Sequence, residues 1–399
     1  MCISMIGTWM QNIAQPWLAY SITKSPFLLS LVSMLQFAPV LLFSLFAGVL
    51  IDKFSKKKIL LLTQSASIVI TLSLAILVWT GNVQYWHILV LATILGVVNT
   101  LDMPARQSFV IELVGKEDLM NAIALNSSLF NIARVVGPAI AGIVMGSVGL
   151  AACFFANAIS FTAVVISLIF IKPLDIHKVT NKGGKILTDI TDGLKYIRHN
   201  EILFDTVLYM AVMGIFVMNF NVLVPVFAKE VLHQEETGFG FLMSFLGLGS
   251  FIGAMFVAAI SNSNSEKAIK FILNIVPFIT SAFLIITGLT RNYLLAGVCL
   301  ALTGIGFVAF TSTANSTMQI NAKNEYRGRV MSVYALLFAG STPIGNLYAG
   351  LIDEHFGGSA GFIACGAVSI LLLIPVYIYK AKSKGIVADK NQQEGIYSG

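Results

Sequence analysis

Long apolar runs separated by short polar stretches dominate this chain of 399 residues. A membrane-spanning helix requires about 20 consecutive, mostly apolar residues. Twelve such runs are present, at residues 3–21, 28–51, 58–80, 86–111, 120–147, 150–171, 203–228, 238–260, 268–289, 293–318, 329–352 and 359–379. Alternating apolar and polar residues between turn signals, which are typical of membrane β-barrels, do not occur. The pattern therefore predicts an all-α membrane protein.

The distribution of basic residues tests this set of twelve spans independently. Cytoplasmic loops of membrane proteins carry an excess of Lys and Arg. With both termini in the cytoplasm, 21 basic residues fall on the inner side and three (Lys24, Lys229 and Arg291) on the outer side, while Arg134 lies within a span. We therefore expect a multi-pass protein of the cell (inner) membrane with both termini cytoplasmic.

Composition excludes several classes of function. Hydrophobic residues make up 57% of the chain and charged residues 11%, against about a quarter charged in soluble proteins. The net charge of +6 is spread over short loops, so it indicates topology and not nucleic-acid binding. Four cysteines and five histidines are dispersed, and we expect no metal site and no cofactor. Neither a phosphate-binding loop nor a Ser/His/Asp grouping is present, so we expect no enzyme.

One long polar segment, residues 172–201, divides the chain into two sets of six spans. Within it Ile186, Ile190, Leu194 and Ile197 have the spacing of an amphipathic helix on the inner membrane face. The halves echo each other weakly, as in "GVVNTLDMPARQ" and "GFVAFTSTANSTMQ". We expect an N-terminal bundle (1–171), a linker (172–201), a C-terminal bundle (202–380) and a cytoplasmic tail (381–399), with the two six-helix bundles around a central site.

Two motifs carry a resemblance to a known family. The loop "GVLIDKFSKKK" after the second span matches the major facilitator superfamily pattern G-x-L-x-D-[RK]-x-G-[RK]-[RK], except that Ser55 replaces its second glycine. In the fifth span "ARVVGPAIAG" resembles the Gly-Pro pattern of the superfamily's exporters, except at Ala141. The run from Asp102 to Pro138 and the later "RGRVMS" are similar to the drug:proton antiporter branch, which contains macrolide-efflux proteins and the enterobactin exporter.

The resemblance implies a mechanism for these motifs. It implies that Asp52 meets the N-terminus of the eleventh span, where the helix dipole stabilises a carboxylate, and latches the bundles together in one conformation. The gating residues implied are Gly48, Asp52, Lys53, Lys56, Lys57, Asp102, Arg106, Gly137, Pro138 and Gly142. Small residues and a proline in the fifth span favour a closely packed, bent hinge or seal. Relatives begin with a basic leader and a longer first helix, so we expect the first helix here to be truncated.

Charged residues within the spans are the candidates for proton coupling. Asp102 and Arg106 are four residues apart and can pair along one helix, either as a structural ion pair or as a switching charge relay. Arg134 lies near mid-bilayer, where a cation costs about 2.5 kcal/mol or more, so it should face the bundle interior. It either pairs with Asp102 or with helix carbonyls, or lines the pathway. The coupling candidates are Asp102, Glu112 and Arg134.

A polar stripe on the first span suggests a cavity. Thr8, Gln11, Asn12 and Gln15 recur at i, i+3, i+4 and i+7, so they share one helix face. Such residues either line a cavity or form interhelical hydrogen bonds of about 0.6–2 kcal/mol each, and four in one stripe favour the cavity. Candidates from other helices are Asn126, Asn131, Asn219, Asn221, Asn315 and Gln319.

These observations predict a secondary transporter that alternates between inward-open and outward-open states. Its expected work is the export of an amphipathic small molecule, a drug or a siderophore, in exchange for protons, by a monomer in the lipid bilayer. The alternatives are an uncoupled facilitator or metabolite exporter of the same fold, and a transport-dead assembly or sensor protein.

Overall fold

A computed structural model describes residues 2–115, 118–171, 186–261 and 265–397. Within these ranges the chain is helical and contains no strand. The N-terminal half comprises α1 (Cys2–Thr23), α2 (Pro26–Lys53), α3 (Lys56–Trp79), α4 (Tyr85–Val114), α5 (Leu119–Ser147) and α6 (Leu150–Phe170). After α7 (Ile186–Arg198), the second half comprises α8 (Glu201–Phe216), α9 (Phe220–Glu230), α10 (Glu236–Ser261), α11 (Glu266–Asn274), α12 (Val276–Leu289), α13 (Tyr293–Asn321), α14 (Arg327–Phe356) and α15 (Ala360–Tyr397). The all-α prediction is confirmed.

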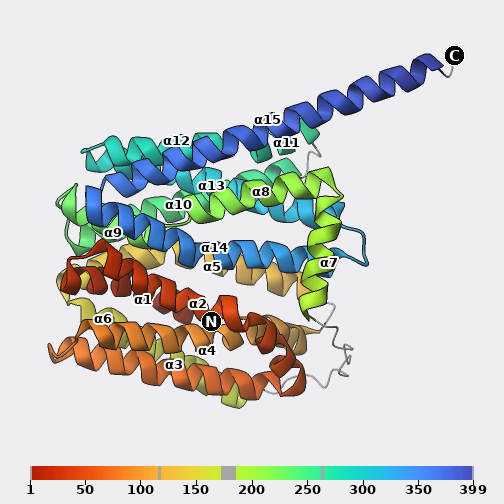
Figure 1. The fold of residues 1–399 in the computed structure, drawn as a ribbon. Helices are drawn as coiled ribbons and strands as arrows, with labels where there is room; N and C mark the ends of the chain where they lie inside the picture. Colours follow the sequence, from red (N-terminus) through yellow and green to blue (C-terminus); the bar gives the residue numbers. More distant parts are fainter. Residues whose placement is uncertain (1, 116–117, 172–185, 262–264, 398–399) are drawn as a thin grey trace.

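Within the described residues, eleven helical segments are long and apolar enough to cross a bilayer, and α1 is not among them. The polar stripe lowers the hydropathy of α1, yet α1 lies inside the N-terminal bundle with Ile13, Ala14 and Trp17 almost fully buried. In Figure 1 α1 begins part-way along the length of its neighbours. Eleven spans together with α1 agree with the predicted twelve-helix fold.

Two predicted spans are each built from two helices. The seventh span consists of α8 and α9, and the break follows Phe216. There the Asn219 side-chain amide donates to the Ile215 carbonyl at 2.8 Å, replacing a lost backbone donor. The ninth span consists of α11 and α12, and Pro277 in the first turn of α12 has no N–H to continue the helix. Apolar run length alone predicted neither break.

The linker helix α7 lies across one end of the molecule, nearly perpendicular to the other helices (Figure 1). Its helical conformation is as predicted, but it packs on the C-terminal bundle. Tyr196 stacks on Tyr326 with ring centroids 4.4 Å apart, and Asp192 pairs with Arg329 at 3.4 Å. Ile197, only 1% exposed, lies in a cluster with Met318 and Val330. The predicted apolar residues Ile186 and Ile190 lie outside the residues whose side chains are described.

The two ends of the bundles differ, and we name them by their connections. The basic end contains α7, the connections at residues 54–55 and 322–326, the C-termini of α4 and α10 and the N-termini of α5 and α11, beside Lys56, Lys57 and Arg327. The tight-turn end contains the connections at residues 24–25, 80–84, 148–149, 231–235, 290–292 and 357–359. Contacts between the bundles are concentrated at only one of these ends, as described next.

Candidate functional site

The bundles meet most closely through glycines of α5 and α10 near the tight-turn end. A Cβ at Gly240 would lie 2.5 Å from the Cα of Gly142 and 2.6 Å from the Pro138 carbonyl oxygen. Thr237 Oγ1 donates to the Gly142 carbonyl at 3.1 Å. Gly137 has a different partner, because a Cβ there would lie 2.5 Å from the Trp9 Cβ of α1. The Gly-Pro motif of α5 is thus one place where the two bundles make backbone contact.

Side chains of α1 extend this contact. Trp17 Nε1 donates to Glu236 Oε1 of α10 at 3.1 Å, and the Trp17 ring stacks on Phe239 at 5.1 Å. We call Trp17, Gly142, Glu236, Thr237 and Gly240 the seal. All of its members lie in the half of the molecule nearest the tight-turn end.

A second set of contacts joins α2 and α14 at the same end. Glu354 accepts hydrogen bonds from Ser25 Oγ at 2.7 Å and from the Phe27 backbone N–H at 3.1 Å. A carboxylate of α14 therefore caps the N-terminus of α2 in the other bundle, where the helix dipole stabilises a negative charge. Beside it, the Tyr20 hydroxyl of α1 bonds Glu230 of α9.

Among the described residues, the interface between the bundles does not extend to the basic end. Contacts reach mid-depth, where a Cβ at Gly247 would meet the Arg134 carbonyl and one at Gly340 would meet Leu41. Closer to the basic end, the facing side chains are exposed. On α14 this is Leu336, one turn from Gly340, and on α5 it is Ser127, two turns from Arg134. Among the described side chains, no hydrogen bond joins the bundles in this half. The structure is closed at the tight-turn end and open at the basic end.

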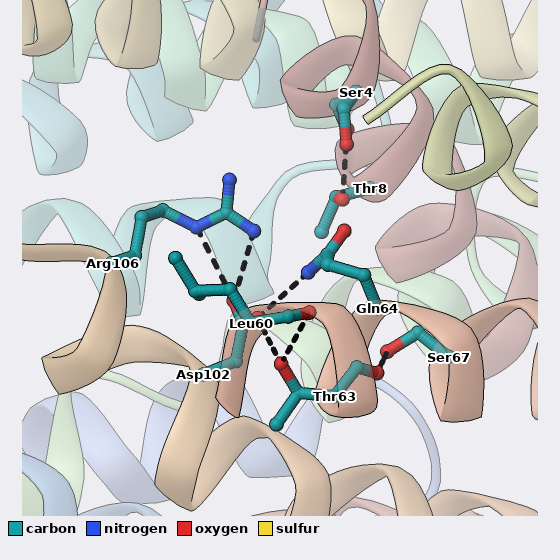
Figure 2. Close-up of polar contacts among 8 residues, drawn as sticks. All are labelled: Ser4, Thr8, Leu60, Thr63, Gln64, Ser67, Asp102 and Arg106. Carbon is teal, nitrogen blue, oxygen red and sulfur yellow. Dashed lines mark hydrogen bonds and ion pairs between the residues drawn. The ribbon is translucent and has the colours of Figure 1, made fainter. Parts of the chain in front are cut away.

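Asp102 is the best-satisfied buried charge of the N-terminal bundle (Figure 2). Its Oδ1 accepts hydrogen bonds from Thr63 Oγ1 and Gln64 Nε2, each at 2.7 Å. Its Oδ2 binds Arg106 at 2.9 Å, which confirms the pairing predicted from their spacing. A cavity of about 130 Å³ borders Gln64 and Arg106 on one side of this group. The arrangement neutralises Asp102 locally and satisfies both of its oxygens.

Arg134 does not join this network. It makes no hydrogen bond or ion pair with any residue that the structure describes, and its side chain is half-buried. The structure does not contain the predicted alternative of an Asp102–Arg134 pair, because the oxygens of Asp102 bind Thr63, Gln64 and Arg106. Glu112 pairs with Lys56 at 3.1 Å, and Lys57 donates to the Ile169 and Ile171 carbonyls at the end of α6.

The polar stripe of α1 is divided between two environments. Gln11 Oε1 accepts hydrogen bonds from Thr71 of α3 at 3.1 Å and Asn157 of α6 at 2.6 Å. Gln15 donates to Gln36 of α2 at 3.0 Å. Both glutamines are buried within their own bundle, so for them the interhelical alternative holds. Thr8 bonds its own helix at Ser4, and Asn12 is half-buried.

The other cavity candidates also fall into two groups. Asn219 is fully buried inside the C-terminal bundle, so it does not line a space between the bundles. Asn126 and Gln319 are exposed, Gln319 bonds Asn315, and Asn131 and Asn221 are half-buried. Gly48, Asp52 and Lys53 lie outside the residues whose side chains are described.

Comparison with known proteins identifies the family. A model described as "Transmembrane secretion effector", one of the major facilitator superfamily (MFS) families, matches residues 1–394. The chain belongs to the major facilitator superfamily. It is 26% identical to the staphyloferrin A transporter of Staphylococcus aureus, over 97% of this chain and 96% of that protein. It is 24% identical to macrolide efflux protein A of Streptococcus pyogenes, over 88% and 87% of the two chains.

Solved structures of this superfamily share the fold. The nucleoside transporter NupG superposes with a TM-score of 0.76 at 10% identity, covering 95% of this chain and 97% of that one. An inward-facing bacterial homologue of the lysosomal transporter Spinster gives 0.73 at 12% identity, covering 95% and 93%. The chain is accordingly an efflux-type MFS transporter, and its relatives are transporters and not enzymes.

Sequence reasoning missed the acidic residues of this MFS transporter at the tight-turn end. Glu230, Asp353 and Glu354, which we call the acidic cluster, stand just beyond the predicted spans 203–228 and 329–352, and no role was predicted for them. The available signal was the repetition of the α2 motif, because "AGLIDEHF" (349–356) resembles "AGVLIDKF" (47–54). In both helices an aspartate ends the apolar run, but the two runs end on opposite sides of the molecule (Figure 1).

Proposed function

We propose that this MFS transporter exports an amphipathic small molecule, a drug or a siderophore, across the cell membrane in exchange for protons. The relatives it resembles include a staphyloferrin A transporter and a macrolide efflux protein, which supports substrates of this size and character. By the positive-inside rule the basic end and both termini face the cytoplasm. The structure then corresponds to the inward-open state.

The observation that carries the proposal is that, among the described residues, contacts between the bundles extend from the tight-turn end to mid-depth and do not reach the basic end. Alternating access requires that one end closes while the other opens. Each neutral hydrogen bond contributes about 0.5–1.5 kcal/mol net, and one to a charged group about 1.5–3 kcal/mol. The contacts of Trp17, Tyr20 and Glu354 therefore favour closure by a few kcal/mol, an amount that substrate or proton binding can reverse.

In the complementary state we expect the basic end to close through the α2–α3 loop. Asp52, with Gly48, Lys53 and Lys56, is the proposed latch there, binding the N-terminus of α14. Glu354 at the end of α14 already caps the N-terminus of α2 at the tight-turn end. Each carboxylate would then cap a helix N-terminus of the opposite bundle, Glu354 when the tight-turn end is closed and Asp52 when the basic end is closed.

Proteoliposomes test the proposal directly. The purified protein is reconstituted and loaded with a fluorescent amphipathic cation or a macrolide, and a pH gradient is imposed across the vesicle membrane. We expect substrate movement against its gradient with counterflow of protons, and loss of both when the pH gradient is collapsed. Downhill movement that ignores the pH gradient would identify an uncoupled facilitator, and no movement of any probe would support an assembly or sensor protein.

A further inference from the structure

We propose that Asp353, on α14 near the tight-turn end, is a proton-binding residue whose protonation permits this end of the transporter to close. The proposal rests on the proposed proton-coupled export and names a residue that would perform the coupling. It follows from the burial, the bonding and the position of this carboxyl group.

Asp353 is buried, and its carboxyl group is only half satisfied. The residue is 2% exposed, its Oδ1 accepts a hydrogen bond from the Gly361 backbone N–H at 2.7 Å, and its Oδ2 has no hydrogen-bond partner among the described residues. A Cβ at Gly361 would lie 2.6 and 2.7 Å from the two carboxyl oxygens, so glycine is required for this approach. A buried carboxylate without a counter-charge is costly, and taking up a proton removes that cost.

No cation compensates the charge of Asp353 within the described structure. The titratable groups that face it are Glu230 of α9, Tyr20 of α1 and Cys365 of α15, with Glu354 next to it on α14. All of these are neutral or acidic. Two basic residues of this end are engaged elsewhere, Lys229 with Glu235 and Arg291 with Ser359. The surroundings therefore favour the protonated, neutral form of Asp353 in the closed state.

Two acidic neighbours of Asp353 make contacts between the bundles. Glu230 accepts hydrogen bonds from Tyr20 of α1 and from the backbone N–H of Gly358, three residues before Gly361. Glu354, the next residue, caps the N-terminus of α2. Opening the tight-turn end breaks both contacts and admits water to this region. A hydrated Asp353 ionises more readily than a buried one, so proton affinity and conformation are coupled.

Two buried asparagines provide a path away from Asp353 toward mid-membrane. Asn346 lies seven residues before Asp353 on the same face of α14, roughly 10 Å along the helix. Its side-chain O and N atoms, and Asn219 Oδ1, are buried without partners among the described residues. Such groups bind internal water, which carries protons. A proton taken up from the tight-turn side would leave by this path toward the basic end, and the ionised Asp353 would then favour reopening.

The test measures the pH dependence of closure. Spin labels at Asn82→Cys and Leu289→Cys, exposed positions of the two bundles at the tight-turn end, report its opening. In the parent protein we expect the closed fraction to increase between about pH 8 and about pH 5, a range that a desolvated carboxyl reaches. Asp353→Asn, permanently neutral, should stay largely closed at every pH, and both proton-driven export and substrate exchange should fall at least about tenfold, because substrate cannot leave through a closed end. Glu325→Gln, which removes an exposed acid at the basic end, should respond like the parent.

Each outcome decides between the two proposals. A parent protein with proton-coupled export and an Asp353→Asn variant with the same pH response would overturn the role of Asp353 and leave the export proposal intact. A parent protein that transports without proton flux overturns the coupling itself. If Asp353→Asn does not accumulate, Asp353→Glu decides. This longer carboxyl should retain a pH response with a shifted midpoint, and an unshifted midpoint would contradict the assignment.

Discussion

Asp102 of the N-terminal bundle and Asp353 of the C-terminal bundle are both buried, but their charges are compensated differently. Asp102 in the N-terminal bundle is 8% exposed, and its oxygens bind Thr63, Gln64 and Arg106. Asp353 in the C-terminal bundle is 2% exposed and has a single backbone donor. The partners of Asp102 all belong to its own bundle, so they persist when the bundles move. Asp353 also has its donor in its own bundle, but its neighbours Glu230 and Glu354 bind α1 and α2 of the other bundle, and these contacts break when the bundles move. A compensated charge suits a fixed element, and an uncompensated one suits a switch.

The largest expected effect comes from holding the seal open, which should affect only one of the two aspartates. In Gly240→Val the new side chain meets the Gly142 backbone, which cannot move aside without separating the bundles. Overpacking of this kind costs about 1–3 kcal/mol, so transport should fall about 5- to 150-fold. Modification by a water-soluble carbodiimide, mapped by mass spectrometry, should rise at Asp353 and not at Asp102.

The control for this experiment is Ala258→Val, an equivalent enlargement at an exposed position of the same helix, α10. It should leave transport and both modification levels unchanged. Normal transport by Gly240→Val would contradict the assignment of the glycine contact as a seal. Equal modification of the two aspartates would remove the difference drawn between them.

Breaking the Asp102 ion pair should have the next largest effect, on stability. Arg106→Gln leaves Asp102 with two neutral donors and no cation. Removing one partner of a buried pair costs about 3–5 kcal/mol, and partial exposure of Arg106 favours the lower value. We expect reduced membrane abundance and a lower melting temperature in detergent, measured by fluorescence-detected size-exclusion chromatography. The double variant Asp102→Asn/Arg106→Gln should recover most of the loss. Failure to recover would point to a further role of Asp102.

The smallest expected effect is the coupling between Asp102 and Arg134. A double-mutant cycle with Asp102→Asn and Arg134→Gln should give a coupling energy below about 0.5 kcal/mol, the additivity expected of independent sites. The same cycle on Asp102 and Arg106 should give more than about 1 kcal/mol. Chemical unfolding or thermal stability of the four proteins measures both. A large Asp102–Arg134 term would show that the two charges meet in another conformation.

Much of the fold could be predicted from the sequence, because lipid imposes a simple rule on span length and loop charge. The same physics fixed the Asp102–Arg106 pair, since both residues lie on one helix and their spacing alone brings them together. Contacts between helices were not predictable in this way. Gln11 and Gln15 share a face in the sequence, but their partners come from α3, α6 and α2, which no periodicity on α1 encodes.

The acidic cluster was missed for a related reason. Asp353 stands where an apolar run ends, and the sequence there is compatible with a solvated loop. Its burial comes from Gly361 on the next helix and from α1 and α9, which approach from elsewhere in the chain. Only the repeated "LID" of α2 and α14 hinted at a shared role, and a repeat of three residues is weak evidence without the structure.

The attachment of α7 to the C-terminal bundle has a consequence for how the transporter can be divided. Because Tyr196 and Asp192 bind Tyr326 and Arg329, the linker helix is a component of the second half, and the natural division of the chain precedes Ile186. Two separately expressed polypeptides, residues 1–171 and 186–399, would each retain a complete set of internal contacts. Division after Arg198 would instead remove from α14 the helix that covers its first turns. Co-expressed halves of the first kind should therefore assemble into a working exporter more readily than halves of the second.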